Sequence, residues 1–255
     1  MGNYSKLSLK LYDTQIMRYT VILFFILFQQ LSQAQNTDKQ FLDDLRLTDE
    51  AYFSKYVKSW KSPEGLLQAL DRSRSIQDKT AIIIQLSNYL SQDKVLNRII
   101  LAIANHSPQK GKADRAWKFR AIAIYMLGEK GEKLSDVQQI RIQETARLYF
   151  RTDREDRVLA AAAYTLVRLA RDDSKQISTH RLFNKRTISY LLSERIVSLK
   201  GHQNYLCWAL TRASVRLGDS FTRHALRETK KKPFHRKVRV VVQDAINTLS
   251  ERKDE

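Results

Sequence analysis

The chain has 255 residues and a formal net charge of +18 at pH 7, and 43% of its residues are hydrophobic. This length allows one substantial core or one continuous array of repeats. The single cysteine, Cys207, excludes an internal disulfide framework. Because Cys207 lies beside Trp208 on a predicted helix, we expect a buried, unreactive thiol.

Residues 1–34 have the three parts of an export signal. Basic residues precede an apolar run, Val21–Phe28, that is too short to span a bilayer. Ser32 and Ala34 place small residues at the positions that a signal peptidase requires, which predicts cleavage between Ala34 and Gln35. We therefore expect a periplasmic or secreted protein of a bacterium, without a stable membrane span. The alternatives are an uncleaved segment that tethers the protein to the membrane and a buried N-terminal helix.

Aromatic residues at helical spacing in residues 35–61 predict helices that cap the first repeat of an array. Ser62 and Pro63 then have the form of a helix start. Alternating strand patterns are absent apart from Val238 to Val242, where the continuation favours a helix, so we predict an all-α array over residues 62–251 and a tail over 252–255. The expected helices are 63–74, 78–91, 93–105, 114–127, 135–150, 154–171, 178–199, 203–217, 220–230 and 235–251.

One helix ending recurs along this array. It is marked by five leucines, which are Leu90, Leu127, Leu169, Leu217 and Leu249. The residues four positions earlier are Leu86, Ala123, Thr165, Ala213 and Ala245, and those eight positions earlier are Ile82, Phe119, Ala161, Ala209 and Val241. These three columns share one side of a helix. The leucines recur unevenly, on average about every 40 residues, a period that is long enough for two helices and their turns. Gly218 supplies the C-cap after Leu217.

The run Phe119–Gly128 resembles the second half of a HEAT repeat, which typically reads Val-Arg, then Ala, then Ala-Leu-Gly. Val238–Ile246 resembles it in a slightly different register, and the likeness covers roughly residues 63–251. The glycine is missing after Leu90, Leu169 and Leu249. The resemblance implies an α-α superhelix, a HEAT-like α-solenoid of the armadillo type with an N-terminal helical cap. HEAT arrays are generally scaffolds that bind along a curved surface, and a few resemble enzymes that act on DNA.

The chain offers little for catalysis or metal binding. Its five histidines show no metal-ligand spacing. Gly128 and Gly131 follow a predicted helix, which indicates a turn and not a phosphate-binding loop. Asp153, Glu155 and Asp156 are concentrated at a predicted helix start, where we expect capping. We therefore expect a protein that is not an enzyme, with no catalytic residue, metal or cofactor.

The positive charge belongs to the array, because residues 94–255 hold 34 basic and 17 acidic side chains. Arginine binds phosphate and carboxylate through paired hydrogen bonds, so a face lined with it would hold an extended anionic partner. A solvated helix face is the plain alternative. The candidate partner-binding residues are Arg147, Arg151, Arg154, Arg157, Arg227, Lys230, Lys231, Lys232, Arg236, Lys237 and Arg239.

The leading hypothesis is an exported, non-enzymatic scaffold that docks an acidic protein assembly or an anionic envelope polymer. The second is a nucleic-acid binder, or an enzyme that resembles HEAT-like DNA glycosylases, with Asp114 and Trp117 on one helical turn and Trp208 near them. The export signal makes nucleic acid the less favoured partner. The third hypothesis is a membrane-tethered structural protein.

Overall fold

A computed structural model of the chain describes residues 62–108, 113–170 and 184–251. Within these ranges it contains ten α-helices, one short 3-10 helix and no strand. The prediction of an all-α fold is therefore confirmed for the described residues. The predicted export signal (1–34) with its cleavage site after Ala34, the predicted capping helices (35–61) and the tail (252–255) lie outside the described residues.

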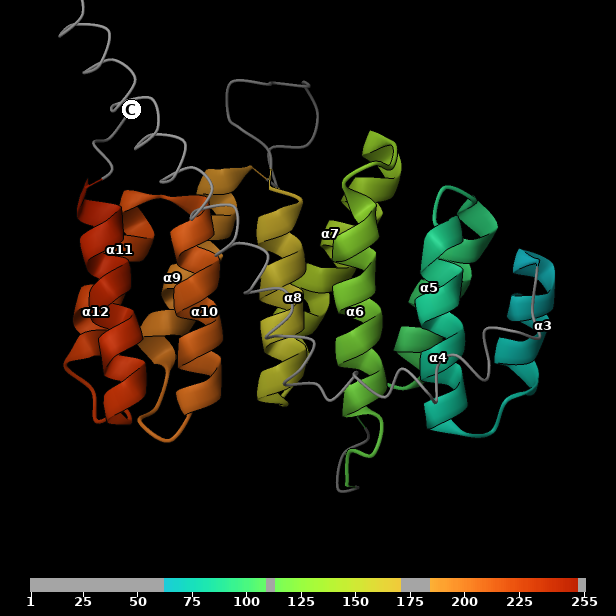
Figure 1. The fold of residues 1–255 in the computed structure, drawn as a ribbon, viewed down its shortest axis with the longest axis horizontal. Coiled ribbons are helices and arrows are strands. Elements are labelled where there is room, and N and C mark those ends of the chain that lie inside the picture. Colours follow the sequence, from blue (N-terminus) through green and yellow to red (C-terminus); the bar gives the residue numbers. More distant parts are fainter. Residues whose placement is uncertain (1–61, 109–112, 171–183, 252–255) are drawn as a thin grey trace, which may run out of the picture. The chain divides into compact units, whose positions relative to one another are not determined.

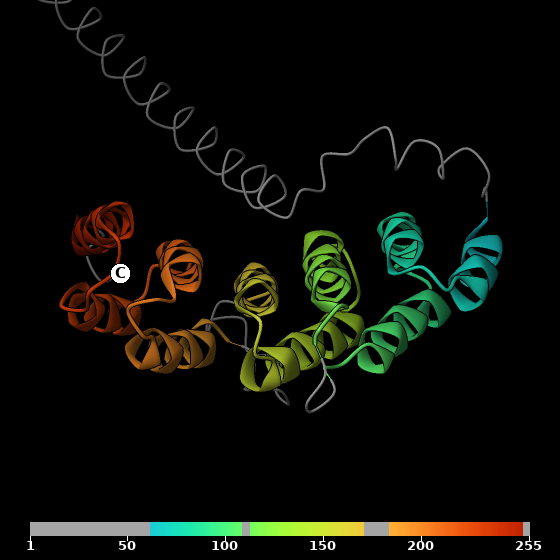
Figure 2. The same ribbon diagram turned by 90° about the horizontal axis from the view of Figure 1, so that it is seen from below.

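The helices follow one another in pairs and form two rows (Figures 1 and 2). The even-numbered row comprises α4 (Ile76–Leu86, continued by the 3-10 helix η1, Ser87–Tyr89), α6 (Trp117–Gly131), α8 (Asp156–Arg168), α10 (Asn204–Leu217) and α12 (Arg236–Glu251). The odd-numbered row comprises α3 (Pro63–Arg72), α5 (Asp93–Asn105), α7 (Asp136–Thr152), α9 (Lys185–Ser198) and α11 (Ser220–Lys230). Successive helices of the even-numbered row pack directly against one another.

Local sequence signals set several helix ends. The Ser62 hydroxyl accepts a hydrogen bond from the Gly65 N–H, at 3.2 Å, and Pro63 occupies the first helical position. Ser135 and Gln138 form a reciprocal capping box at the start of α7. Gly218 ends α10 with a φ of 73°, a left-handed conformation that favours glycine. The predicted helix start at Ser62 and the predicted C-cap at Gly218 are confirmed.

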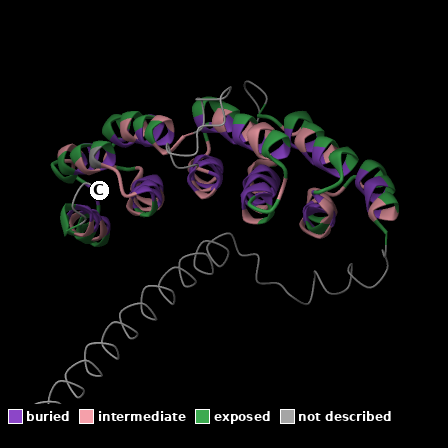
Figure 3. Ribbon diagram, turned by 90° about the horizontal axis from the view of Figure 1, so that it is seen from above, coloured by how far each residue is buried: buried purple, intermediate pink, exposed green. Residues whose placement is uncertain are grey.

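The three residue columns are the recurring leucines and the residues four and eight positions before them. All of these residues lie in the even-numbered row, either in its helices or in the turns that end them. Thirteen of these fifteen residues are buried, and only Ala209 and Val241 are partly exposed. Figure 3 shows the buried residues gathered where the two rows meet. The columns are therefore the packing surfaces by which each even-numbered helix contacts its neighbours.

The prediction of a helix end at Leu127, followed by a turn at Gly128 and Gly131, is wrong. Helix α6 continues through both glycines to Gly131. A methyl group at Gly128 would lie 2.6 Å from the Thr165 hydroxyl oxygen and 2.9 Å from the Thr165 Cα. Gly128 thus allows the close approach of α6 and α8, which the Thr165 hydroxyl secures by donating to the Ile124 carbonyl at 2.8 Å.

Candidate partner-binding surface

Arginine and aromatic side chains alternate from the N-terminal ends of α6 and α8 to α10, where they extend from its start to just past its middle; the three helices are neighbours in the even-numbered row (Figure 1). The Arg157 guanidinium carbon lies 4.9 Å from the centroid of the Trp117 ring and 5.5 Å from that of the Tyr205 ring. The Tyr205 and Trp208 rings are 6.0 Å apart, and the Arg212 guanidinium lies 5.4 Å from the Trp208 centroid. We call these five residues the N-terminal band.

The two arginines of this band are only weakly neutralised. The Arg157 side chain is 43% exposed, and it pairs with Glu155 at 3.4 Å. Arg212 is exposed and forms no ion pair with any described residue. The protein around Arg212 lowers the pKa of its guanidinium by partial desolvation. A cation that is stacked on a ring and has no carboxylate beside it is suited to bind a carboxylate of a partner.

A second group of side chains crosses the C-terminal halves of the same helices. We call it the C-terminal band, and it consists of Tyr125, Glu129, Glu132, Tyr164, Arg168 and Arg216. The Tyr125 and Tyr164 rings stack at 4.9 Å, and the guanidinium groups of Arg168 and Arg216 lie 5.8 and 5.7 Å from the Tyr164 centroid.

Acidic residues neutralise this second band. Arg168 pairs with Glu129 at 2.6 Å and with Glu132 at 3.0 Å, and its side chain is only 13% exposed. Burial alone would lower the pKa of Arg168, but Tyr164 and the two glutamates raise it above the ordinary value. Arg216 reaches Glu132 at 4.0 Å. The two bands share an architecture but differ in one arginine each: Arg168 is neutralised by two glutamates, whereas Arg212 has no ion pair with a described residue. Arg157 and Arg216 each have one glutamate nearby, at 3.4 and 4.0 Å.

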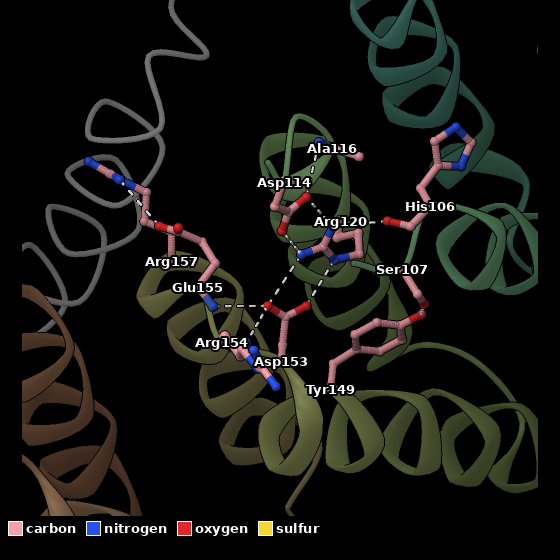
Figure 4. A network of polar contacts seen from close by, with 10 residues as sticks. All are labelled: His106, Ser107, Asp114, Ala116, Arg120, Tyr149, Asp153, Arg154, Glu155 and Arg157. Carbon is pink, nitrogen blue, oxygen red and sulfur yellow. Dashed lines mark hydrogen bonds and ion pairs between the residues drawn. The ribbon is translucent and has the colours of Figure 1, made fainter. Parts of the chain in front are cut away.

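A buried ion-pair network supports the ends of α6 and α8 from which the N-terminal band projects (Figure 4). Its centre is Arg120, whose side chain is completely buried. The Nε of Arg120 donates to Asp153 Oδ2 at 2.9 Å, and Nη1 donates to the His106 carbonyl and to Asp114 Oδ1, both at 2.9 Å. Asp153 lies between α7 and α8, and Asp114 and His106 precede α6. One guanidinium therefore fixes two interhelix connections relative to α6.

Asp114 is committed to this network. Hydrogen bonding to Arg120 holds the pKa of the Asp114 carboxyl below its ordinary value, against the opposing effect of burial. Asp114 also accepts a hydrogen bond from the Ala116 N–H at 3.1 Å. A carboxylate bound in this way is a poor general base. The rings of Trp117 and Trp208 contact Arg157, Tyr205 and Arg212.

The basic residues predicted from the sequence lie on several parts of the structure. Arg147 and Arg151 are on α7 in the odd-numbered row, and Arg154 is in the connection to α8. Of the four predicted arginines between residues 147 and 157, only Arg157 lies in the N-terminal band. The remaining predicted residues surround the start of α12: Arg227, Lys230, Lys231, Lys232, Arg236, Lys237 and Arg239.

Two lysines of this second cluster already have partners. Lys232 donates to the carbonyls of Val197 and Leu199, the latter at 2.8 Å, at the C-terminal end of α9. Lys231 pairs with Glu228 at 2.8 Å. Lys231 remains exposed, as are Arg227, Lys230, Arg236, Lys237 and Arg239. Lys232 thus helps to end a helix, as cations near a helix C-terminus do.

Sequence reasoning missed Arg212 and Tyr205 as members of a candidate site. The available signal was the i, i+4 spacing of Trp208 and Arg212, which places a ring and a cation on one helix face. The contact of Arg157 with Tyr205 joins two helices that are not consecutive in the chain, and it requires the packing of α8 against α10.

The described residues contain no group of three or more His, Cys, Asp or Glu that could hold a metal ion. None of the described helices is long and apolar enough to cross a membrane. Comparisons of the chain with protein-family profiles, with curated proteins and with solved structures found no match.

Proposed function

We propose that this protein is an exported, non-enzymatic scaffold that docks an anionic partner on its N-terminal band. The observation that carries the proposal is the pair of ring-stacked arginines, Arg157 and Arg212, which present guanidinium groups with little or no neutralisation. Stacking on Trp117 and Trp208 restricts these side chains, so less conformational entropy is lost when an anion binds. The net charge of +18 attracts anionic partners over longer distances.

The repeated pairing of helices supports a HEAT-like α-solenoid as the scaffold. Each even-numbered helix carries the same buried columns, and each contacts the next even-numbered helix. In such arrays one row of helices forms an extended binding surface. The N-terminal band lies across three consecutive helices of one row, where a partner that follows the array would contact it.

Binding of a fluorescent acidic peptide, in which uncharged residues separate the glutamates, tests the docking function when it is followed by fluorescence anisotropy at low and moderate salt. The Arg157→Gln/Arg212→Gln variant loses two charges from the band, and Arg227→Gln/Arg239→Gln loses two charges outside it. We expect the first variant to lose roughly a hundredfold in affinity and the second less than about fivefold. Equal losses would mean that binding depends on the overall charge of the protein, which would contradict docking on the N-terminal band.

The export part of the proposal has its own test. Intact-mass analysis and N-terminal sequencing of the native protein, after separation of periplasmic, membrane and cytosolic fractions, should give a soluble chain that begins at Gln35. A full-length chain in the cytosol would contradict export, and a full-length chain in the membrane fraction would indicate a tether.

A further inference from the structure

We infer that the partner of the N-terminal band is an acidic protein segment in extended conformation, with two carboxylates no more than about five residues apart. This inference rests on the proposed docking function and adds the chemical class of the partner. It follows from the spacing of the two arginines, the occupation of the ring faces and the carboxylates that surround the band.

The spacing of Arg157 and Arg212 is limited by the rings between them. The path from the Arg157 guanidinium through the centroids of Tyr205 and Trp208 to the Arg212 guanidinium has segments of 5.5, 6.0 and 5.4 Å. The direct separation cannot exceed the length of this path. An extended peptide advances about 3.3 Å per residue, so about five residues span the whole path. A spacing of at most about five residues between the two carboxylates therefore covers every separation of the guanidinium groups that this path allows.

The rings of the band are poor platforms for nucleic-acid bases. Proteins that bind single strands stack successive bases on free aromatic faces. Here the Trp117 ring contacts Arg157, the Trp208 ring contacts Arg212, and the Tyr205 ring lies between Arg157 and Trp208. Each ring thus already contacts an arginine or another ring, which leaves fewer ring faces for bases, and the arginines held against these rings favour an oxyanion.

Carboxylates interrupt the positive charge around the band. Glu155 lies at 3.4 Å from Arg157, and Asp156 accepts a hydrogen bond from Gln203 at 3.1 Å, between α8 and α10. Glu129 and Glu132 occupy the C-terminal halves of the same face. A polyanion with a charge at every repeat unit would place phosphates against these carboxylates. A peptide can place uncharged residues there and carboxylates only at the two arginines.

Tryptophan emission and anisotropy of the full-length protein test this inference. A Trp60→Phe background leaves Trp117 and Trp208 as the two tryptophans, and both belong to the band. The probes are a peptide with two glutamates about four positions apart, a peptide of equal composition with them about twelve apart, an oligothymidylate and an inorganic polyphosphate of matched charge. Each is titrated into this protein and into its Arg212→Gln and Arg216→Gln variants.

We expect the closely spaced peptide to change the tryptophan emission and to bind at least about tenfold more tightly than the widely spaced one. Arg212→Gln should remove this preference, and Arg216→Gln, which lies one turn later in the neutralised C-terminal band, should keep it. Tighter binding of the oligothymidylate or polyphosphate, with the same loss in Arg212→Gln, would overturn the inference but leave the docking function standing. Failure of every probe to respond to Arg212→Gln would overturn both.

Discussion

Arg120 on α6 and Asp153 before α8 form a completely buried ion pair, with Nε and Oδ2 at 2.9 Å and Nη2 and Oδ1 at 3.2 Å. Trp117 lies three residues before Arg120, and Arg157 lies four residues after Asp153. The ion pair therefore joins the two helix ends that bring the Trp117 ring and the Arg157 guanidinium together. The candidate surface depends on a polar contact beneath it.

Arg120→Met should destabilise the fold by about 3–5 kcal/mol, because it leaves the Asp153 carboxylate buried without its cation. Urea denaturation followed by circular dichroism measures the change. Arg98→Met is the matched control, since Arg98 pairs with Asp71 at the surface, where the two side chains are 40% and 47% exposed. The control should lose no more than about 1 kcal/mol. Similar losses in both variants would mean that the buried pair contributes no more than a surface pair.

Asp114 should make the fold sensitive to acid. The pKa of its carboxyl in the folded protein lies below the ordinary value of 3.8, chiefly because of the hydrogen bond from Arg120. The stabilisation by ionised Asp114 is therefore present above that ordinary value and is lost as the pH falls through the lower folded pKa. Urea midpoints measured between pH 6 and pH 2 should fall less steeply below pH 4 for Asp114→Asn than for the unmodified protein. Parallel curves for the two proteins would contradict this assignment.

Gly128→Ala should destabilise the protein by about 1–3 kcal/mol, because the new methyl group meets both the side chain and the Cα of Thr165. Gly131→Ala is the control within the same helix. Its methyl group would meet only the ends of Ile142 and Leu169, at 3.2 to 3.3 Å. The higher helix propensity of alanine, about 1 kcal/mol, should offset that contact. Thermal unfolding measures the stability of both variants. A Gly128→Ala variant as stable as Gly131→Ala would mean that α6 and α8 can move apart without a loss of stability.

Cys207 should resist alkylation in the folded protein. Burial raises the pKa of its thiol to about 11. At pH 8 about one molecule in a thousand then carries the thiolate, and the buried position reduces access further. Iodoacetamide should therefore react at least about a hundredfold more slowly with the native protein than with protein in urea, as followed by mass spectrometry. Equal rates would place the thiol at the surface.

The helices were predictable because their signals are local. Ser62 followed by Pro63, the Ser135 capping box and the glycine after Leu217 each act within one helical turn, and the structure has a helix end at each of them. Gly128 misled the prediction because glycine favours both a helix end and a close helix contact. The neighbour that decides between these roles, Thr165, lies on another helix and comes close only when α6 and α8 pack.

The candidate surface was only partly predictable for a related reason. A density of arginines indicated an anionic partner, but composition does not show which arginines an acidic neighbour neutralises. The sequence does not distinguish Arg168 from Arg212. In the structure, Arg168 forms ion pairs with Glu129 and Glu132, whereas Arg212 has no ion pair with a described residue. That difference arises when α6, α8 and α10 pack side by side.

The most direct measurement compares Arg212→Gln with Arg216→Gln in isothermal titration with an acidic peptide whose glutamates are separated by uncharged residues. Both variants lose one positive charge from α10, one turn apart, but Arg216 lies near Glu132 and Arg212 has no such partner among the described residues. We predict that Arg212→Gln weakens binding roughly tenfold and that Arg216→Gln weakens it by less than about threefold. Equal weakening, or a larger loss in Arg216→Gln, would contradict the assignment of docking to the N-terminal band.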